Sequence, residues 1–122
     1  MNKLLYVAGP YSGDTADNIA RAEEVSIGLI RKGFHVFTPH KNMAGYEQYE
    51  GNGIGYKTWM DMDLDFLRRC DAMYVMLNSE RSVGVQKELK FARRKKIPVI
   101  HEMEYPYSGF TLEMYAEIIE EK

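Results

Sequence analysis

Short, continuous runs of apolar residues alternate along the chain with longer segments in which apolar residues recur every three or four positions. The continuous runs predict strands that are buried on both faces, and the longer spacing predicts amphipathic helices. The predicted strands cover residues 4–8, 34–37, 72–77 and 97–100. The predicted helices cover residues 14–32, 56–69, 82–95 and 111–120. This alternation predicts an α/β domain with a parallel sheet of four or five strands and right-handed crossovers.

The length of 122 residues suits a single domain, so we take residues 1–122 as one unit. Apolar residues make up 45% of the chain and charged residues 28%, as is ordinary for a soluble globular protein. The net charge of -2 provides no basic field that would attract nucleic acid or an anionic membrane. No apolar segment approaches the roughly 20 residues that a membrane span needs. We therefore expect a cytoplasmic protein that binds neither nucleic acid polymers nor membranes.

Residues that commonly bind metals and cofactors are sparse in this chain. Cys70 is the single cysteine, which fits a reducing compartment, and the three histidines lie at no spacing that suits a metal site. The chain has neither a G-x-G-x-x-G dinucleotide fingerprint nor a G-x-x-x-x-G-K-[ST] phosphate loop. We therefore predict no metal ion and no cofactor.

Residues 40–55 interrupt the regular pattern with several glycines and asparagines, among which lie Tyr46 and Tyr49. We interpret this stretch as a long loop that begins at His40. Long loops in compact domains are often functional, so one interpretation is a lid that carries tyrosines. A surface loop without a role explains the composition equally well.

Helical phase places one aspartate of the predicted 56–69 helix on an unexpected side. At 100° per residue, Asp63 falls on the apolar face of this helix, one turn after Trp59. Asp61 and Asp65 fall on the opposite, polar face. Two of the three aspartates therefore behave as solvated residues should, and Asp63 does not.

The predicted 82–95 helix gives the same result for a glutamate. Val85 and Ala92 mark its inward face, Lys87 marks its outward face, and Glu88 lies in the middle of the inward group. An unpaired buried carboxylate is costly, so a protein usually keeps one for a partner or for a reaction. The alternative is a structural carboxylate that accepts hydrogen bonds from backbone amides or from a buried arginine.

Glu88 follows the carboxyl end of the third predicted strand, which is the edge at which ligands bind in open α/β sheets. The first strand ends at the same edge in a turn of small residues, which lets a ligand approach the backbone closely. A serine and a glycine then mark a helix start whose free N–H groups suit an anion. The residues that we expect to bind the substrate are Gly9, Pro10, Tyr11, Ser12, His40, Ser82 and Gly84.

Two carboxylates without a metal suit chemistry at a glycosidic bond. One carboxylate attacks the anomeric carbon, and the other, kept protonated by burial, assists the leaving group. An aromatic hydroxyl from Tyr6 or Tyr11 would lie at the same edge of the sheet. The inward pair Asp63 and Glu88 therefore predicts an enzyme of this kind.

Four segments of the chain, in this order, resemble the nucleoside 2-deoxyribosyltransferase superfamily. That superfamily includes the 2′-deoxynucleoside 5′-monophosphate N-glycosidases and a small branch from bacteria and phages. The resemblance spans about residues 4–101, and the pattern S-x-G-x-x-x-E-L-x-x-A is its most specific part. The four segments are YVAGPY at 6–11, FTP at 37–39, DLDFLRRCD at 63–71 and SVGVQKELKFA at 82–92.

The resemblance implies a Rossmann-like, flavodoxin-like three-layer fold and a retaining mechanism through a covalent deoxyribosyl-enzyme intermediate. It gives Glu88 the role of nucleophile, Asp63 the role of proton donor towards the base, and Tyr6 the role of positioning the nucleophile. It also implies that Ser82 and Gly84 contact the 5′ end of the substrate, as phosphate or as hydroxyl. Members of the superfamily are commonly homodimers or larger.

The chain departs from the nucleotide N-glycosidases in its first turn, where Pro10 and Ser12 replace a serine and an arginine that bind phosphate. The choice between a nucleoside and its 5′-monophosphate, and between hydrolysis and transfer, therefore stays open. Two other functions fit the sequence: a non-catalytic nucleotide-binding module and an NAD-cleaving glycohydrolase.

The chain is rich in methionine and tyrosine, with 8 and 9 residues respectively. These numbers exceed what one small core should need, so we expect a homodimer or a larger homo-oligomer. Ordinary filling of the core by methionine is the alternative.

Overall fold

A computed structural model of the chain describes residues 3–43 and 53–120. All strand pairs in it are parallel, and the strand order is β2-β1-β3-β4. The predicted α/β fold with a parallel sheet is confirmed, with four strands in the described residues. The strands are β1 (Leu4–Ala8), β2 (His35–Phe37), β3 (Ala72–Val75) and β4 (Val99–His101). The helices are α1 (Thr15–Arg31), α2 (Pro39–Met43), α3 (Tyr56–Arg68), α4 (Val83–Arg94) and α5 (Leu112–Glu120).

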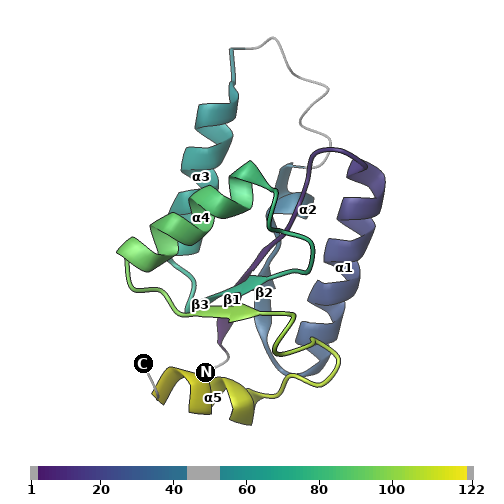
Figure 1. The fold of residues 1–122 in the computed structure, drawn as a ribbon, viewed down its shortest axis with the longest axis vertical. Helices are drawn as coiled ribbons and strands as arrows, with labels where there is room; N and C mark the ends of the chain where they lie inside the picture. Colours follow the sequence, from purple (N-terminus) through teal and green to yellow (C-terminus); the bar gives the residue numbers. More distant parts are fainter. Residues whose placement is uncertain (1–2, 44–52, 121–122) are drawn as a thin grey trace.

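Helices cover both faces of the sheet, which gives the molecule three layers (Figure 1). Leu5 and Val7 of β1 point into the core shared with α1 and α5, whereas Tyr6 and Ala8 point into the core shared with α3 and α4. Successive side chains of a strand face opposite sides of a sheet, so a strand that is covered on both faces must be apolar throughout. This requirement explains the continuous apolar run at the start of the chain.

The order of the strands creates a switch point between β1 and β3. The chain runs from β1 outward to β2 and then returns through α3 to the other side of β1, where it forms β3. The helix that follows β1 packs on one face of the sheet, and the helix that follows β3 packs on the other. In open α/β sheets, ligands bind where two such connections diverge.

Helix α1 begins and ends close to the predicted positions. The Asp14 carboxylate accepts a hydrogen bond from the Asp17 N–H at 3.2 Å, and Gly33, with a φ of 101°, follows the end of the helix. On this helix, Leu29 is fully buried but the adjacent Ile30 is 48% exposed. Ile30 lies 100° around the helix from Leu29, which places it at the margin of the buried face.

The predicted loop at residues 40–55 was wrong at its start, because Pro39–Met43 forms α2. Pro39 occupies the first helical position, where its missing N–H costs no hydrogen bond. Tyr46 and Tyr49, the residues of the predicted lid, lie outside the described residues. None of the helices within residues 3–43 and 53–120 is both long enough and apolar enough to cross a membrane.

Candidate active site

A cleft of about 570 Å³ opens at the carboxyl ends of β1 and β3. It is lined by the β1–α1 turn, α2, α3, and the start of α4 together with the loop that precedes it. Both inward carboxylates, Asp63 and Glu88, lie in its wall. All of the residues that the sequence predicts to bind the substrate also line the cleft, namely Gly9, Pro10, Tyr11, Ser12, His40, Ser82 and Gly84.

Glu88 is paired with Tyr6, which lies 82 residues away in the sequence. The Tyr6 hydroxyl donates a hydrogen bond to Glu88 Oε2. Glu88 is 6% exposed, and Tyr6 is fully buried and does not itself line the cleft. The Tyr6 ring stacks against Phe37 with 5.8 Å between the ring centroids, which fixes the direction of its hydroxyl. Of the two tyrosines considered from the sequence, it is therefore Tyr6 that contacts Glu88.

Burial raises the pKa of Glu88 from 4.5 to about 8. The hydrogen bond from Tyr6 opposes this shift because it stabilises the carboxylate, and the negative charge of Asp63 adds to the shift. Burial, and then the negative charge of Glu88, raise the pKa of the Tyr6 hydroxyl well above its usual value of 10.0. Tyr6 therefore keeps its proton at neutral pH and remains a hydrogen-bond donor to Glu88.

The aspartates of α3 separate as helical phase predicts. Asp61 and Asp65 are exposed and form ion pairs with Lys57 at 2.8 Å and with Arg68 at 3.2 Å. Asp63 is half-buried and makes no hydrogen bond or ion pair with any residue in the described part of the chain. Burial raises the pKa of Asp63 from 3.8 to about 6. Its carboxyl group is therefore available to a ligand and exchanges its proton near neutral pH.

Helix α4 presents its N-terminus to the cleft. Ser82 caps the helix, and its Oγ accepts a hydrogen bond from the Val85 N–H at 3.2 Å. A methyl group on Gly84 would lie 3.6 Å from Met60 and 3.8 Å from the Tyr56 hydroxyl, which is ordinary contact. The glycine therefore relieves no clash within the protein and instead keeps the cleft open. Ser82 Oγ satisfies the Val85 N–H, which leaves the Val83 and Gly84 N–H groups without an intrahelical partner. No acidic residue lies in that turn, so this end suits an anion.

The β1–α1 turn is fixed from α1. Asn18 Nδ2 donates hydrogen bonds to the carbonyl oxygens of Tyr11 and Ser12, at 3.2 and 2.9 Å. At Gly9, an added methyl group would lie only 2.4 Å from Met76 Sδ. From the sequence, we interpreted the small residues of this turn as room for the approach of a ligand, and Gly9 lines the cleft. Its missing side chain makes room for Met76 in the core.

His40 supports the same turn from α2. Its Nε2 lies 2.7 Å from the Pro10 carbonyl oxygen, which can only accept, so Nε2 carries the proton. Burial lowers the pKa of His40, which keeps the ring neutral at pH 7. Its Nδ1 is buried and has no hydrogen-bond partner among the described residues. His40 lines the cleft, but the contact that it makes is to the backbone of the turn.

Arg81 and Tyr56 also line the cleft, and neither was predicted from the sequence. Arg81 lies in the loop before α4 and forms no ion pair with any residue that the structure describes. Its position next to the capping Ser82 could have been used to predict it from the sequence, because a positive charge there adds to the positive end of the helix dipole. Tyr56 and Trp59 precede Asp63 by two turns and one turn of α3, so all three share a face.

The family of the chain is shown by a family model described as a domain of unknown function, DUF7768, which matches residues 3–102. The chain belongs to this family. The DUF7768 match runs from the start of β1 to Glu102 and includes every residue that lines the cleft. Among curated proteins, no match to the chain is found.

Two solved structures share the fold of this DUF7768 protein. One is a 2-deoxyribosyltransferase from the psychrotolerant bacterium Bacillus psychrosaccharolyticus, with a TM-score of 0.57 and 20% identity over 80% of this chain and 70% of that one. The other is a 2-deoxyribosyltransferase from Leishmania mexicana, with a TM-score of 0.58 and 24% identity over 81% of this chain and 63% of that one. The chain thus spans less than two thirds of the Leishmania protein. At these identities the likeness establishes the Rossmann-like fold alone.

Proposed function

We propose that this protein is an enzyme that breaks the N-glycosidic bond of a deoxynucleoside or its 5′-monophosphate, through a covalent bond between Glu88 and the sugar. The observation that carries the proposal is the buried Tyr6–Glu88 pair at the cleft that Asp63 also lines. The fold likeness to two 2-deoxyribosyltransferases supports the same class of chemistry.

In the first step, an oxygen of Glu88 forms a bond to the anomeric carbon while the bond from that carbon to the base breaks. The electron pair of the broken bond moves to the base nitrogen, and Asp63 gives its proton to the base, which leaves neutral. The hydrogen bond from Tyr6 holds one oxygen of Glu88, and the other oxygen is directed to the sugar.

In the second step, a water molecule or a second base attacks the same carbon and breaks its bond to Glu88. Asp63, now a carboxylate, accepts the proton that the attacking molecule releases. Two displacements at one carbon retain its configuration. Hydrolysis and transfer differ only in the acceptor, so the same residues serve both.

The protonation states of the free protein are the reverse of those that the first step needs. With a pKa of about 8 for Glu88 and about 6 for Asp63, the main form at pH 7 has a protonated Glu88 and an ionised Asp63. The form with these states exchanged is a minor one, because each site must then hold its less favoured protonation state. The base of a bound substrate desolvates Asp63 and so favours its protonated form. The positive charge that develops on the sugar stabilises an ionised Glu88 in the transition state.

Aromatic side chains of the cleft support a nucleobase as the leaving group. Trp59 and Tyr56 lie in the wall that α3 forms, on the face that also carries Asp63. A planar base that stacks on these rings would bring a ring nitrogen to the Asp63 carboxyl group. This arrangement is why we propose a nucleoside rather than an oligosaccharide as the substrate.

The start of α4 suits the 5′ end of the same substrate. Gly84 precedes Glu88 by four residues, or roughly 6 Å along the axis of the helix at 1.5 Å per residue. A sugar that reacts with Glu88 through its anomeric carbon would therefore present its 5′ oxygen to the Gly84 N–H and to Arg81. The β1–α1 turn lacks the arginine of the nucleotide N-glycosidases, but Arg81 supplies a positive charge from the loop before α4. We therefore include 5′-monophosphates among the substrates.

A base-release screen tests the proposal. The protein is incubated with the common deoxynucleosides, their 5′-monophosphates, the ribonucleosides and NAD, each with and without a second base, and released bases are separated by chromatography. We expect release from a deoxynucleoside or deoxynucleotide, and no release by Glu88→Gln. Release of nicotinamide from NAD alone would identify a glycohydrolase for NAD instead. If no compound loses its base, the proposal is wrong.

A nucleotide-binding module without catalysis is the second candidate, and the protonation state of Glu88 favours it. A protonated glutamate is a poor nucleophile, but it can donate a hydrogen bond to a ligand. Such a module would bind a nucleotide without releasing its base, and Glu88→Gln would bind it with unchanged affinity. Calorimetric titration of both proteins with the same nucleotide separates the two functions.

A homo-oligomer remains part of the proposal. Met103 is 72% exposed and Met114 is 40% exposed, so these methionines do not fill the core of one chain. Met60, by contrast, lines the cleft. Light scattering coupled to gel filtration measures the mass in solution, and a monomer at all concentrations would contradict the expectation.

A further inference from the structure

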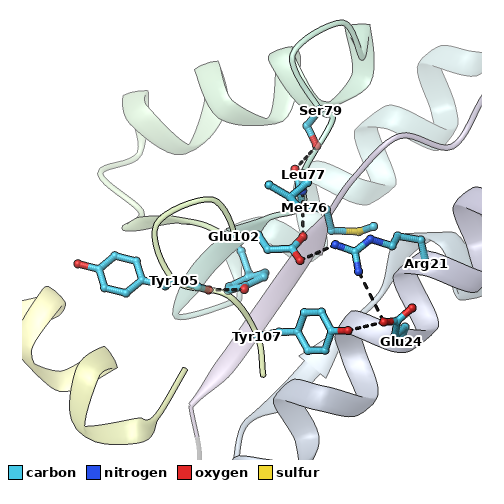
Figure 2. A network of polar contacts seen from close by, with 9 residues as sticks. Arg21, Glu24, Met76, Leu77, Ser79, Glu102, Tyr105 and Tyr107 are labelled. Atoms are coloured by element: carbon cyan, nitrogen blue, oxygen red, sulfur yellow. Dashed lines mark hydrogen bonds and ion pairs between the residues drawn. The ribbon is translucent and has the colours of Figure 1, made fainter. Parts of the chain in front are cut away.

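An ion pair outside the cleft joins three elements at the carboxyl edge of the sheet (Figure 2). Arg21 Nη2, on α1, donates to Oε2 of Glu102, which follows β4, at 2.5 Å. Glu102 is 4% exposed and Arg21 is 33% exposed, and neither lines the cleft. The other oxygen of Glu102 accepts a hydrogen bond from the Leu77 N–H at 2.9 Å. The carboxylate therefore connects α1 to the β3–α4 loop, which comprises residues 76–82.

The β3–α4 loop is closed by hydrogen bonds of its own. Ser79 Oγ donates to the Met76 carbonyl at 2.7 Å, and the Ser82 N–H donates to the Ser79 carbonyl at 3.1 Å. Asn78 has a φ of 65°, in the left-handed region, which asparagine adopts more readily than most other non-glycine residues. The loop is thus a compact unit, and the contact of Leu77 with Glu102 fixes its first turn.

Three residues of this loop line the cleft, namely Asn78, Arg81 and Ser82. Arg81 has no ion pair within the described residues, so its position follows from the backbone of the loop. The Arg21–Glu102 pair therefore acts on the cleft through the loop, without touching the cleft itself.

The β1–α1 turn on the other side of the switch point is attached to the same helix. Asn18 lies one turn before Arg21 on α1, and it donates to the carbonyl oxygens of Tyr11 and Ser12. The β1–α1 turn and the β3–α4 loop, which both line the cleft, are thus held by neighbouring side chains of α1. The distance between these two segments is set by one rigid helix.

We propose that Arg21 and Glu102 are positioning residues, which set the β3–α4 loop and with it the end of the cleft that receives the 5′ group of the substrate. This inference rests on the proposed glycosidic function. Glu88 and Asp63 lie on the bodies of α4 and α3, and Glu88 is held separately by Tyr6. Loss of the pair should therefore weaken the binding of the substrate and leave the chemical step nearly unchanged.

Steady-state kinetics of Arg21→Met, Glu102→Gln and the double variant test this proposal. We expect KM to rise about tenfold in each single variant, with kcat within about twofold of the parent. The double variant should also show a KM about tenfold higher, and not a hundredfold, because both substitutions remove the same ion pair. If a single variant fails to fold, the double variant carries the test, since it leaves no buried charge without a partner.

Asp65→Asn is the matched control, because it also turns the carboxylate of an ion pair into an amide, but at an exposed site far from the loop. Its KM and kcat should equal those of the parent. Amide hydrogen exchange provides a second measurement that does not depend on turnover. The Leu77 amide should exchange about tenfold faster in Glu102→Met, which removes the acceptor of its hydrogen bond, while the Ala92 amide inside α4 keeps its rate.

The outcomes separate a positioning role from a merely structural one. A fall in thermal stability with unchanged KM, or equal losses in kcat and in affinity, would overturn the proposal. If the parent protein releases no base from any substrate, the proposed function has failed, and hydrogen exchange then decides alone. Faster exchange confined to the β3–α4 loop supports the positioning role, and unchanged exchange at Leu77 refutes it.

Discussion

Glu88 and Glu102 are both buried glutamates, with exposures of 6% and 4%, but their partners differ. Glu102 accepts hydrogen bonds from the Arg21 guanidinium and from the Leu77 backbone, so its negative charge is compensated. Glu88 accepts a hydrogen bond from Tyr6, a neutral hydroxyl, and among the described residues no cation pairs with it. Burial by itself therefore does not mark a reactive carboxylate. Burial without a cationic partner, in the wall of a cleft, is the feature on which we base the proposed reactivity of Glu88.

The two environments have opposite energetic consequences. Removal of either partner of a compensated carboxylate destabilises the fold, because it leaves the other partner without its hydrogen bonds. An uncompensated one opposes folding whenever it is ionised, and this cost appears as a raised pKa. The fold retains Glu88 in spite of that cost, as expected for a residue that takes part in a reaction.

The largest difference between the two glutamates is expected in the effect of their substitution on kcat. Glu88→Gln keeps the shape of the side chain but removes the nucleophile, so kcat should fall at least about a thousandfold. Glu102→Gln should change kcat by no more than about twofold. Base release measured under saturating substrate checks both values. Equal losses in the two variants would show that the two glutamates do not differ in the way proposed.

The two substitutions should also change the stability of the fold in opposite directions, with a gain for Glu88→Gln and a loss for Glu102→Gln. Glu88 has a pKa of 4.5 in the unfolded chain and about 8 in the folded one, so the folded state binds more protons between these values. The free energy of unfolding of the parent therefore falls as the pH rises from about 4.5 to 8. Glutamine does not titrate, so Glu88→Gln should gain stability over the parent, on the order of 3 kcal/mol at pH 8 and close to zero at pH 4.

Denaturant unfolding at pH 4, 6 and 8 measures this gain. Glu102→Gln serves as the contrast, because it should lose about 1–2 kcal/mol at pH 8 through the broken ion pair. A gain by Glu88→Gln that is the same at pH 4 and at pH 8 would mean that Glu88 does not carry a raised pKa.

The sequence alone located Glu88 but not what distinguishes it from Glu102. Helical phase identified Glu88 and Asp63, since both lie on regular amphipathic helices. Glu102 lies just after a three-residue strand, where no periodicity shows which way a side chain points. The contact between Tyr6 and Glu88 joins residues 82 positions apart, and only the resemblance to a known superfamily suggested it.

Errors at other positions have similar causes. The glycine-rich composition of residues 40–55 concealed α2, because a five-residue helix is too short to show a period. The contact of Gly9 with Met76 was missed, because it depends on tertiary packing that no local pattern reveals. Arg81 was missed for a simpler reason, since its place before a helix cap could have been read from the sequence.

Tyr6→Phe sharpens the comparison by removing the hydrogen bond that Tyr6 donates to Glu88. That bond lowers the pKa of Glu88, so its loss should raise this pKa further. The fraction of Glu88 that is ionised at pH 7 should therefore fall. We expect kcat/KM at pH 7 to fall about tenfold, which corresponds to a rise of about one pKa unit. The fold should persist, because the ring keeps its place against Phe37.

The pH dependence of kcat/KM gives the matching measurement. The proposed mechanism requires an ionised Glu88 and a protonated Asp63, so the parent profile should rise up to about pH 6, stay level, and fall above about pH 8. In Tyr6→Phe the falling limb should move to higher pH. In Asp63→Asn the falling limb should disappear, because no proton on residue 63 remains to be lost. A falling limb that persists in Asp63→Asn would assign it to another group.

The smallest effect is expected from Gly84→Ala. The added methyl group meets its nearest neighbour at 3.6 Å, so the protein should fold normally, but the methyl group narrows the end of the cleft near Ser82. We expect KM to rise roughly fivefold with kcat little changed. Gly9→Ala is the contrast, because its methyl group would lie 2.4 Å from Met76 and should lower the thermal stability instead. Normal KM in Gly84→Ala would remove this end of the cleft from the substrate site.

The most direct test of Glu88 as the nucleophile is a mass measurement of the protein after a rapid acid quench during turnover. A covalent intermediate predicts a fraction of the protein heavier by one deoxyribosyl group, and peptide sequencing should place that group on Glu88. Glu88→Gln should show no such species. Base release without any added mass on the parent protein, or with the added mass on another residue, would contradict a covalent role for Glu88.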